Sequence, residues 1–246
     1  MELKFETAPN KIDRGVSFII FSDPGVGKTT MATTLPEKET LIINSEAGLG
    51  PLLGTSHLVF NIRKAMDGGH SVEDIMSQLI MNLRTKKLPC KNVVIDNMSE
   101  LVELLILDYT KQRNKKFPEL KEHGDTSYKI REWMHNLRDL VYQDINVVFN
   151  AWEFIKEIKS MDGILVSKNI PMIGNKIAFQ CSGIVDCVGH LEVHEKSGRR
   201  WVRFGPSNQY LTKTQFKGLA DGEPADFPAI INKLKDWDYS QEEEKK

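Results

Sequence analysis

The sequence predicts an α/β protein with a mostly parallel central sheet, helices on both faces and a C-terminal third rich in β-hairpins. Up to residue 150, short apolar runs typical of buried strands alternate with segments of helical character. Such alternation is typical of parallel sheets, because each crossover between parallel strands carries a helix. After residue 150 the helices give way to paired strand-like segments that flank short turns. Together the patterns predict one continuous domain over residues 1–238 and a disordered, charged tail at 239–246.

The elements of the first part follow one another in a regular order. Apolar runs predict strands at 17–21, 40–44, 57–62, 92–95 and 146–150. Apolar spacing and leucine-rich composition predict helices at 28–34, 72–84, 99–115 and 126–142. Ser71 is the expected N-cap of the second of these helices, because its hydroxyl can accept the backbone N–H of Asp74.

The last part is expected to contain two hairpins and a closing helix. The first hairpin joins 154–158 to 164–169 through Ser-Met-Asp-Gly at 160–163. The second joins 184–194 to 199–205 through Glu-Lys-Ser-Gly at 195–198. An amphipathic helix is predicted over 227–237.

The composition excludes several classes of protein. Basic residues number 33 against 34 acidic ones, and this net charge of −1 argues against a large, uniformly basic surface for nucleic acid. A local basic groove stays open, since lysine and arginine are unevenly spread. No apolar stretch reaches the roughly 18–20 residues of a membrane span, and the N-terminal residues lack the apolar segment of a signal peptide. With only three cysteines, these features predict a cytoplasmic protein.

The strand expected at 17–21 leads into FSDPGVGKTT, which has the pattern of a phosphate-binding loop. In such loops, backbone N–H groups surround the phosphates of a nucleotide. Lys28 is expected to reach the β- and γ-phosphate oxygens, and the Thr29 hydroxyl to bind Mg²⁺. The pattern therefore predicts that ATP or GTP is bound by Asp23, Pro24, Gly25, Val26, Gly27, Lys28, Thr29 and Thr30.

One position departs from the phosphate-loop pattern. The glycine that normally stands five residues before Gly27 is replaced by Ser22. Pro24 and Gly25 still supply a tight turn, so the loop is expected to form with the Ser22 side chain closely packed. The sequence leaves open whether Ser22 slows hydrolysis.

Two acidic residues follow strands that should end at the same edge of the sheet. Asp96 closes the apolar run NVVI, where a carboxylate can hold the water shell of Mg²⁺ near Thr29. The next residue is Asn97 and not a glutamate, so a catalytic base must come from elsewhere. Glu46 closes the strand at 40–44, and we predict that it orients and deprotonates the attacking water.

Asn150 ends the strand expected at 146–150. This topology places that strand between the strands of Ser22 and Asp96, so the Asn150 side chain is predicted to sense the γ-phosphate and to pass its presence to the following segment. Glu153 is a weaker alternative for the same role.

A zinc site is an alternative for the C-terminal third. Cys181, Cys187, His190 and His194 are types of residue that bind zinc, although structural zinc sites usually space their cysteines two to four residues apart. The alternation of 184–194 is typical of a strand, which would place Cys187 and His190 on opposite faces. A hairpin strand is therefore the preferred interpretation.

The order of these motifs resembles that of RecA-type recombinases, and in particular of phage-encoded, core-only RecA-like ATPases. The resemblance spans residues 17–219 and is carried by SDPGVGKTT, LIINSEAG, NVVIDNMSEL and NVVFNAWE. The segments DTSYKIREWMHNLRDL and IPMIGNKIAFQCSGIVDCVGHLEV are more loosely similar. In the recombinases the segment that matches INSEAG supplies the catalytic glutamate, which corresponds to Glu46.

The resemblance implies a RecA-like P-loop fold, hydrolysis of ATP with Mg²⁺, and action on single-stranded DNA in phage recombination or strand annealing. It also implies self-association into a ring or filament, a single-strand-binding protein as a further partner, and the cytoplasm of a bacterial host as the location. One departure concerns Gln215, which stands where the family carries the arginine of a Lys-Thr-Arg sequence. Lys213 is then the candidate cation that acts across a subunit interface.

Basic and aromatic residues gather in three parts of the sequence. In RecA-like proteins, loops after the central strands bind single-stranded DNA through backbone contacts and base stacking. We expect such loops around Met161 and at 169–176, whereas solvated faces of helices and hairpins are the alternative for each cluster. The clusters are Lys111, Arg113, Lys115 and Lys116; Lys156, Lys159, Lys168 and Lys176; and Arg199, Arg200, Trp201 and Arg203.

Two other functions stay open at this point. A nucleotide or small-molecule kinase also begins with a phosphate loop, but it normally has an arginine-rich lid, and none is visible between Asp96 and Asn150. A nucleotide-gated DNA-binding accessory protein with little turnover would carry the same motifs. An ATPase assay with and without single-stranded DNA separates these functions.

Overall fold

The computed structural model describes residues 9–159, 163, 165–174 and 177–240. Its strands are β1 (Ser17–Ser22), β2 (Thr40–Asn44), β3 (Leu58–Asn61), β4 (Asn92–Asp96), β5 (Asn146–Lys159), β6 (Leu165–Pro171), β7 (Cys187–Val193), β8 (Arg200–Arg203), β9 (Lys213–Thr214) and β10 (Glu223–Pro224). Its α-helices are α1 (Lys28–Ala32), α2 (Ile62–Asp67), α3 (Val72–Arg84), α4 (Met98–Gln112), α5 (Leu120–Arg138), α6 (Ala178–Ile184) and α7 (Phe227–Asp236). Three short 3₁₀ segments are Glu37–Glu39, Gly50–Leu52 and Asp139–Gln143.

The described strands form one sheet with a parallel centre. The strand order is β10-β8-β7-β1-β5-β4-β2-β3, with β6 paired to β5 and β9 paired to β7. Every pairing among β3, β2, β4, β5, β1 and β7 is parallel, whereas β6, β8, β9 and β10 join by antiparallel pairing. As predicted, β5 lies between β1 and β4, with Asn150 level with Ile20 of β1.

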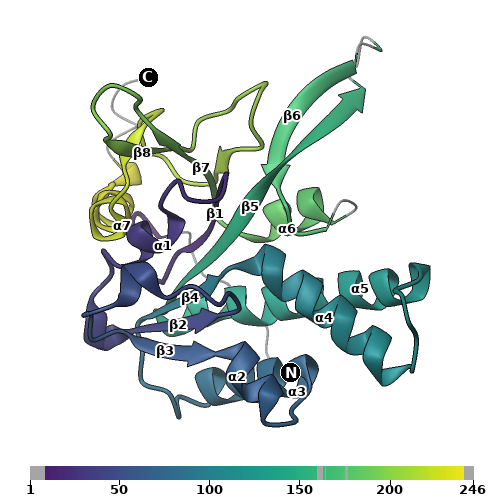
Figure 1. Ribbon diagram of the computed structural model, residues 1–246. Helices are drawn as coiled ribbons and strands as arrows, with labels where there is room; N and C mark the ends of the chain where they lie inside the picture. The colour runs from purple at the N-terminus through teal and green to yellow at the C-terminus, as the bar shows by residue number, and fades with distance from the viewer. Residues whose placement is uncertain (1–8, 160–162, 164, 175–176, 241–246) are drawn as a thin grey trace, which may run out of the picture.

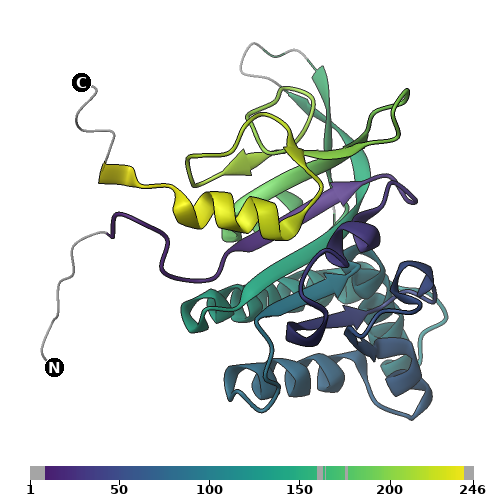
Figure 2. The same ribbon diagram turned by 90° about the vertical axis from the view of Figure 1, so that its left-hand side faces the viewer.

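Helices cover both faces of the sheet, because the central strands are apolar on both sides. On one face, Ile19, Phe21, Ile43 and Phe149 pack in a core that also contains residues of α3, α4, α5 and α6. On the other face, Phe18 and the residues that alternate with the first set pack against α1 and α7. Figures 1 and 2 show these two helical layers on either side of the strands. The predicted arrangement of a mostly parallel sheet with helices on both faces is confirmed.

Several predicted elements agree closely with the structure. The strand predicted at 40–44 and the helix predicted at 72–84 have the observed bounds of β2 and α3. The hydroxyl of Ser71 accepts the backbone N–H of Asp74 at 3.0 Å, so the predicted N-cap is confirmed.

Other predicted elements were wrong in extent, and the strand predicted at 57–62 ends at Asn61, where the unpredicted helix α2 begins at Ile62. Helix α5 begins at Leu120 and not at 126, because Glu119 and Glu122 form a capping box at its start. The short helix α6 was not predicted. Its last residue is Ile184, where a strand was predicted to begin, and the observed strand β7 begins only at Cys187. The strand predicted at 146–150 does not end there.

Strand β5 instead continues to Lys159 as one element that merges with the strand predicted at 154–158. Residues 153–159 pair antiparallel with β6, and this pairing supports the strand beyond the sheet. We call residues 153–159 together with β6 the arm, and Figure 1 shows it projecting from the end of the sheet. Residues 160–162 of the predicted turn and residue 164, the first of the strand predicted at 164–169, lie outside the described residues, as do 175–176 of the second predicted DNA-binding loop.

The C-terminal residues follow the predicted closing helix, which is observed as α7. Residue Tyr239, the first of the predicted tail, donates its backbone N–H to the Asn10 carbonyl oxygen at 3.0 Å. Residues 241–246 of that tail lie outside the described residues, and the domain boundary at 238 stays a prediction. Within the described part of the chain, none of the helices combines the length and apolar character needed to span a membrane.

Candidate nucleotide-binding site

The predicted phosphate loop connects the end of β1 to the start of α1, at the carboxyl edge of the parallel strands. Two glycines in the loop have positive φ angles, +81° at Gly25 and +116° at Gly27, a conformation that side chains strongly disfavour. Helix α1 begins directly after Gly27, whose carbonyl oxygen accepts the N–H of Met31 at 2.8 Å. The strand–loop–helix context that a phosphate loop requires is therefore present.

Lys28 lies inside this loop, where its side chain is almost fully buried. Its Nζ donates to the carbonyl oxygens of Ser22 at 3.0 Å and Asp23 at 2.9 Å. Burial lowers the pKa of Lys28 to about 8, although the nearby carboxylates of Asp96 and Glu46 act in the opposite direction. The loop thus holds a cation with little water around it, which suits the binding of phosphate oxygens.

Ser22, the residue that departs from the usual glycine, takes part in holding Lys28. Its hydroxyl accepts the Lys28 Nζ at 3.1 Å and donates to the Asp23 carbonyl oxygen at 3.1 Å. The side chain is buried, so the loop accommodates it as predicted.

Three polar side chains from separate elements meet beside Lys28. The Thr29 hydroxyl donates to Asp96 Oδ2 at 2.7 Å, and Asn150 Nδ2 donates to Asp96 Oδ1 at 2.9 Å. Asp96 and Asn150 are both buried, and Asn150 Oδ1 has no hydrogen-bond partner among the described residues. Hydroxyl, carboxylate and amide oxygens are hard ligands of the kind that Mg²⁺ prefers, directly or through water. The residues predicted for magnesium and γ-phosphate contacts therefore form one connected group that fits the ion.

Glu46 follows β2 and lies at the same edge of the sheet. The amide of Asn97 donates to Glu46 Oε1. Burial, and then the neighbouring Asp96 carboxylate, raise the pKa of Glu46, while the Lys28 ammonium lowers it. The half-buried carboxylate is therefore more basic than an ordinary surface glutamate, as a general base should be.

Sequence analysis missed the residues that hold the ends of β2 and β4 together. The Ser45 hydroxyl donates to the Asn97 carbonyl oxygen at 2.7 Å and accepts the Asn97 N–H at 2.9 Å. Arg63 donates to the Ser45 carbonyl oxygen at 3.0 Å and forms an ion pair with Glu100. Asn97 also caps α4, since its Oδ1 accepts the Glu100 N–H at 2.8 Å. The position of Asn97 directly after Asp96 is the sequence feature that could have indicated its place at this edge of the sheet.

Glu153, the weaker alternative to Asn150, has a different environment. Its Oε2 lies 2.7 Å from Nε2 of His190, and its other oxygen accepts the amide of Asn169. The His190 ring stacks on Tyr210 with centroids 4.0 Å apart. Glu153 therefore joins the start of the arm to β7, whereas Asn150 contacts Asp96.

The zinc alternative finds no support in the described residues. Cys187 and His190 belong to strand β7, as preferred, and Cys181 belongs to α6. Within the described part of the chain, no group of three or more His, Cys, Asp or Glu residues is arranged to hold a metal ion.

Two groups of predicted cationic residues lie away from the phosphate loop. Lys213 of β9 is level with Val188, toward the start of β7, and donates to the Gly183 carbonyl oxygen at 3.2 Å. It therefore lies toward the opposite edge of the sheet from the loop of its own subunit. Arg113 and Lys115 form ion pairs with Glu122, so this part of the first basic cluster stabilises the α4–α5 connection.

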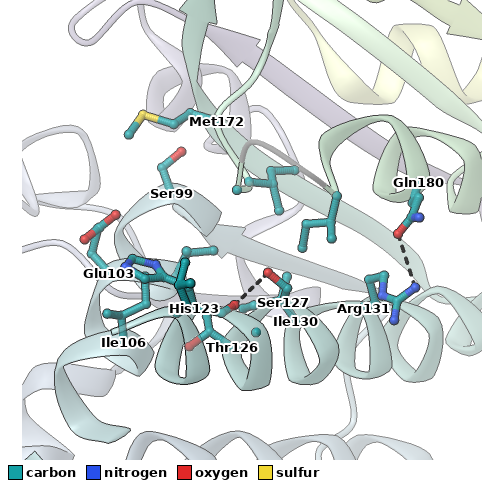
Figure 3. A pocket seen from close by; sticks show the side chains of 16 residues that line it. Ser99, Glu103, Ile106, His123, Thr126, Ser127, Ile130, Arg131, Met172 and Gln180 are labelled. Carbon is teal, nitrogen blue, oxygen red and sulfur yellow. Dashed lines mark hydrogen bonds between the residues drawn. The ribbon is translucent and has the colours of Figure 1, made fainter. Parts of the chain in front are cut away.

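A cavity of about 690 Å³ lies between α4, α5 and the segment that leads from β6 into α6 (Figure 3). Its wall is mainly apolar, with Ile106, Ile130 and Ile173 among its lining residues, and Arg131 bonds Gln180 at its rim at 3.2 Å. None of the residues predicted to bind the nucleotide lines this cavity. The predicted site and this cavity are therefore separate features.

The fold and the site together define the class of P-loop nucleotide-binding proteins. A family model described as an AAA domain matches residues 14–216, most of the chain. The protein therefore belongs to this AAA-domain family, a result that supports a P-loop ATPase of the AAA type. A comparison with curated proteins found no match.

Proposed function

We propose that the protein binds Mg·ATP at the phosphate loop and hydrolyses it. The observation that carries this proposal is the hydrogen-bonded group of Thr29, Asp96 and Asn150 beside the buried Lys28 ammonium. Lys28 would hold the β- and γ-phosphate oxygens. Thr29 and Asp96 would hold Mg²⁺, which when bound neutralises charge on the phosphates. Asn150 would sense the terminal phosphate through its unpartnered Oδ1.

Glu46 would accept the proton of the attacking water. Its carboxylate is kept basic by burial and by Asp96, and the amide of Asn97 fixes the direction of one oxygen. The other carboxylate oxygen can then face the water, since a general base must lie within hydrogen-bond reach of the proton it removes.

We further propose that the arm binds single-stranded DNA. Lys156 stands directly opposite Lys168 in the β5–β6 register, and like charges directly opposite each other destabilise an antiparallel pair. The cross-strand neighbours on the same face, Ile158 and Val166, are apolar. Beside this face, Lys156 Nζ lies 5.4 Å from the ring centroid of the exposed Phe179. Paired cations next to apolar and aromatic groups suit a phosphodiester backbone with stacked bases.

The continuity of β5 supports coupling between the two activities. One strand carries Asn150 at the proposed nucleotide site and Lys156 on the arm, so a shift at one position would be transmitted along a hydrogen-bonded element. On the resemblance to RecA-like ATPases, we propose that the protein acts in recombination or strand annealing, in a self-associated assembly of phage origin that works with a single-strand-binding protein.

The test is an ATPase assay of the purified protein with and without single-stranded DNA. Stimulation by DNA supports the proposal, whereas phosphate transfer to a nucleoside monophosphate would identify a kinase. ATP binding without turnover under both conditions would identify an accessory protein. Lys28→Ala should abolish hydrolysis, and Glu46→Gln should bind ATP but hydrolyse it at least about a hundredfold more slowly, the lower end of the range for a general base. Parental rates in either variant would contradict the site assignment.

A further inference from the structure

Arg200 lies over the phosphate loop, although 172 residues separate it in sequence from Lys28. It is the first residue of β8 and pairs with Val193, the last residue of β7. Strand β7 runs parallel to β1, with His190 level with Phe21. Because β7 continues past His190 to Val193, its end and Arg200 reach the level of the loop that follows β1.

The side chain of Arg200 is in direct contact with that loop. Its Nε donates to the Val26 carbonyl oxygen at 2.7 Å. A Cβ atom built on Gly27 would lie only 2.5 Å from Nε and 2.9 Å from Cδ of Arg200. The guanidinium therefore packs against the glycine that precedes Lys28, the part of the loop whose N–H groups face the phosphates in proteins of this class.

The contact with Val26 uses only one of the three guanidinium nitrogens. Within the described residues, the Arg200 Nη1 and Nη2 groups have no hydrogen bond or ion pair to the protein. By contrast, Arg203 on the same strand pairs with Glu192 at 3.1 Å. An arginine that is held by Nε and has both Nη groups without a protein partner among the described residues can bind an anion in a bidentate manner. Phosphate is the anion expected here, because phosphate-binding loops of this pattern bind it.

We propose that Arg200 binds the nucleotide in its own subunit: Nε holds the phosphate loop while the Nη groups donate to a phosphate of ATP or ADP. This inference rests on the proposed nucleotide-binding function and deepens it. It assigns to the nucleotide site an arginine that sequence analysis grouped with the basic residues for DNA. Arg200 also places a cation of the same chain beside the phosphate loop, whereas Lys213 of that chain lies toward the opposite edge of the sheet.

The experiment measures the dissociation constants of Mg·ATP and Mg·ADP by titration calorimetry for the full chain and four variants. Arg200→Ala should weaken both nucleotides by roughly tenfold or more, the effect of one hydrogen bond to a charged group. Arg200→Lys should recover only part of the loss, because an ammonium cannot bond Val26 and phosphate in the same fork. Arg199→Ala, at the neighbouring exposed position, is the matched control and should bind like the parent. In steady-state assays, Arg200→Ala should raise KM more than it lowers kcat.

The fourth variant, Lys28→Ala, separates the two levels of the proposal. If the parent binds no Mg·ATP, or binds it no better than Lys28→Ala, the nucleotide-binding function itself fails. If the parent binds, Lys28→Ala does not, and Arg200→Ala stays within twofold of Arg199→Ala, only the role of Arg200 is overturned. Circular dichroism and thermal unfolding confirm that each variant is folded, and Arg200→Lys keeps the test decisive should the alanine variant fail to fold.

Discussion

At the scale of single residues, the proposed binding of nucleotide at Lys28 should change the charge of this side chain. Burial lowers the pKa of Lys28 to about 8 in the protein alone, so the ammonium loses its proton as the pH rises above 8. Bound phosphates would stabilise the charged form, and binding above pH 8 would therefore take up a proton. We expect the affinity for Mg·ATP to fall by up to about tenfold per pH unit above pH 8.

Titration calorimetry at pH 7 and pH 9 in buffers of different ionisation enthalpy checks this expectation. Proton uptake should appear at pH 9 and be small at pH 7. An affinity that stays constant from pH 7 to pH 9 would mean that Lys28 remains fully charged in the protein alone.

Asn97 offers a second test at the same scale, because it has two separable roles. Its Oδ1 caps α4, and its Nδ2 holds Glu46. Asn97→Ser retains a capping hydroxyl but removes the amide donor, so the unfolding temperature should change little. Without that donor the Glu46 carboxylate is less well oriented, and kcat should fall by about tenfold or more with little change in KM.

Asn97→Ala is the matched variant for the capping role. It removes both groups, so it should show the same loss in kcat and also lower the free energy of unfolding by about 1 kcal/mol. If Asn97→Ser turns over ATP at the parental rate, Asn97 does not position the base.

At the scale of elements, the sequence predicted what local patterns determine and missed what distant partners determine. The strands β2 and β4 are apolar runs closed by polar residues, and local composition predicted β2 with its observed bounds and β4 to within one residue. Helix α6, in contrast, is short, contains a glycine and has no side-chain cap, so no local sequence pattern predicts it. Strand β5 was predicted to stop at Asn150, because the mixed sequence beyond it has no clear strand pattern. Pairing of Ala151 and Trp152 with β1, and of residues 153–159 with β6, extends the strand.

The capping box of Glu119 and Glu122 at the start of α5 was also missed, and its Glu122 has an unusual environment. Glu122 is fully buried, and its carboxylate accepts Arg113 Nη1 at 2.7 Å and the backbone N–H of Glu119 at 2.8 Å. The bond from Arg113 and the other donors lower the pKa of Glu122 to about 2. A carboxylate with a lowered pKa stabilises the fold above its unfolded pKa of about 4.5, and this contribution is lost as the pH falls toward 2.

Urea unfolding between pH 6 and pH 2.5 should therefore show a decline in stability that Glu122→Gln reduces. At pH 6 the Glu122→Gln variant should already be less stable than the parent, since a neutral amide removes one of the two carboxylates that pair with Arg113 and leaves only Asp125. Glu103→Gln, an exposed position on α4, is the control and should keep the parental pH dependence. An unchanged pH dependence in Glu122→Gln would exclude this carboxylate as its source.

At the scale of the whole molecule, the proposed nucleotide site is assembled from strands that are distant in sequence. Lys28, Thr29 and Asp96 could be predicted, because their roles are tied to motif spacing and to the shared edge of parallel strands. Arg200 could not be assigned to the loop, because its place depends on how far β7 extends past the end of β1. Sequence patterns thus predict which residues follow a strand, whereas contacts between strand ends require the register of the sheet.

The last prediction concerns the arm, which extends the central strand β5 beyond the body of the protein (Figure 1). If Lys168 contacts a DNA phosphate, Lys168→Ala should weaken single-stranded DNA binding and reduce the slope of log affinity against log salt by about 0.7. The same change removes one of two like charges that face each other across β5 and β6, so thermal stability should stay the same or rise slightly. Lys121→Ala, an exposed lysine of α5, is the control and should keep the parental salt slope. Fluorescence anisotropy with a labelled oligonucleotide at several salt concentrations, together with thermal unfolding, checks both expectations. A lower stability with an unchanged slope would show that the facing lysines serve the structure of the arm and do not bind DNA.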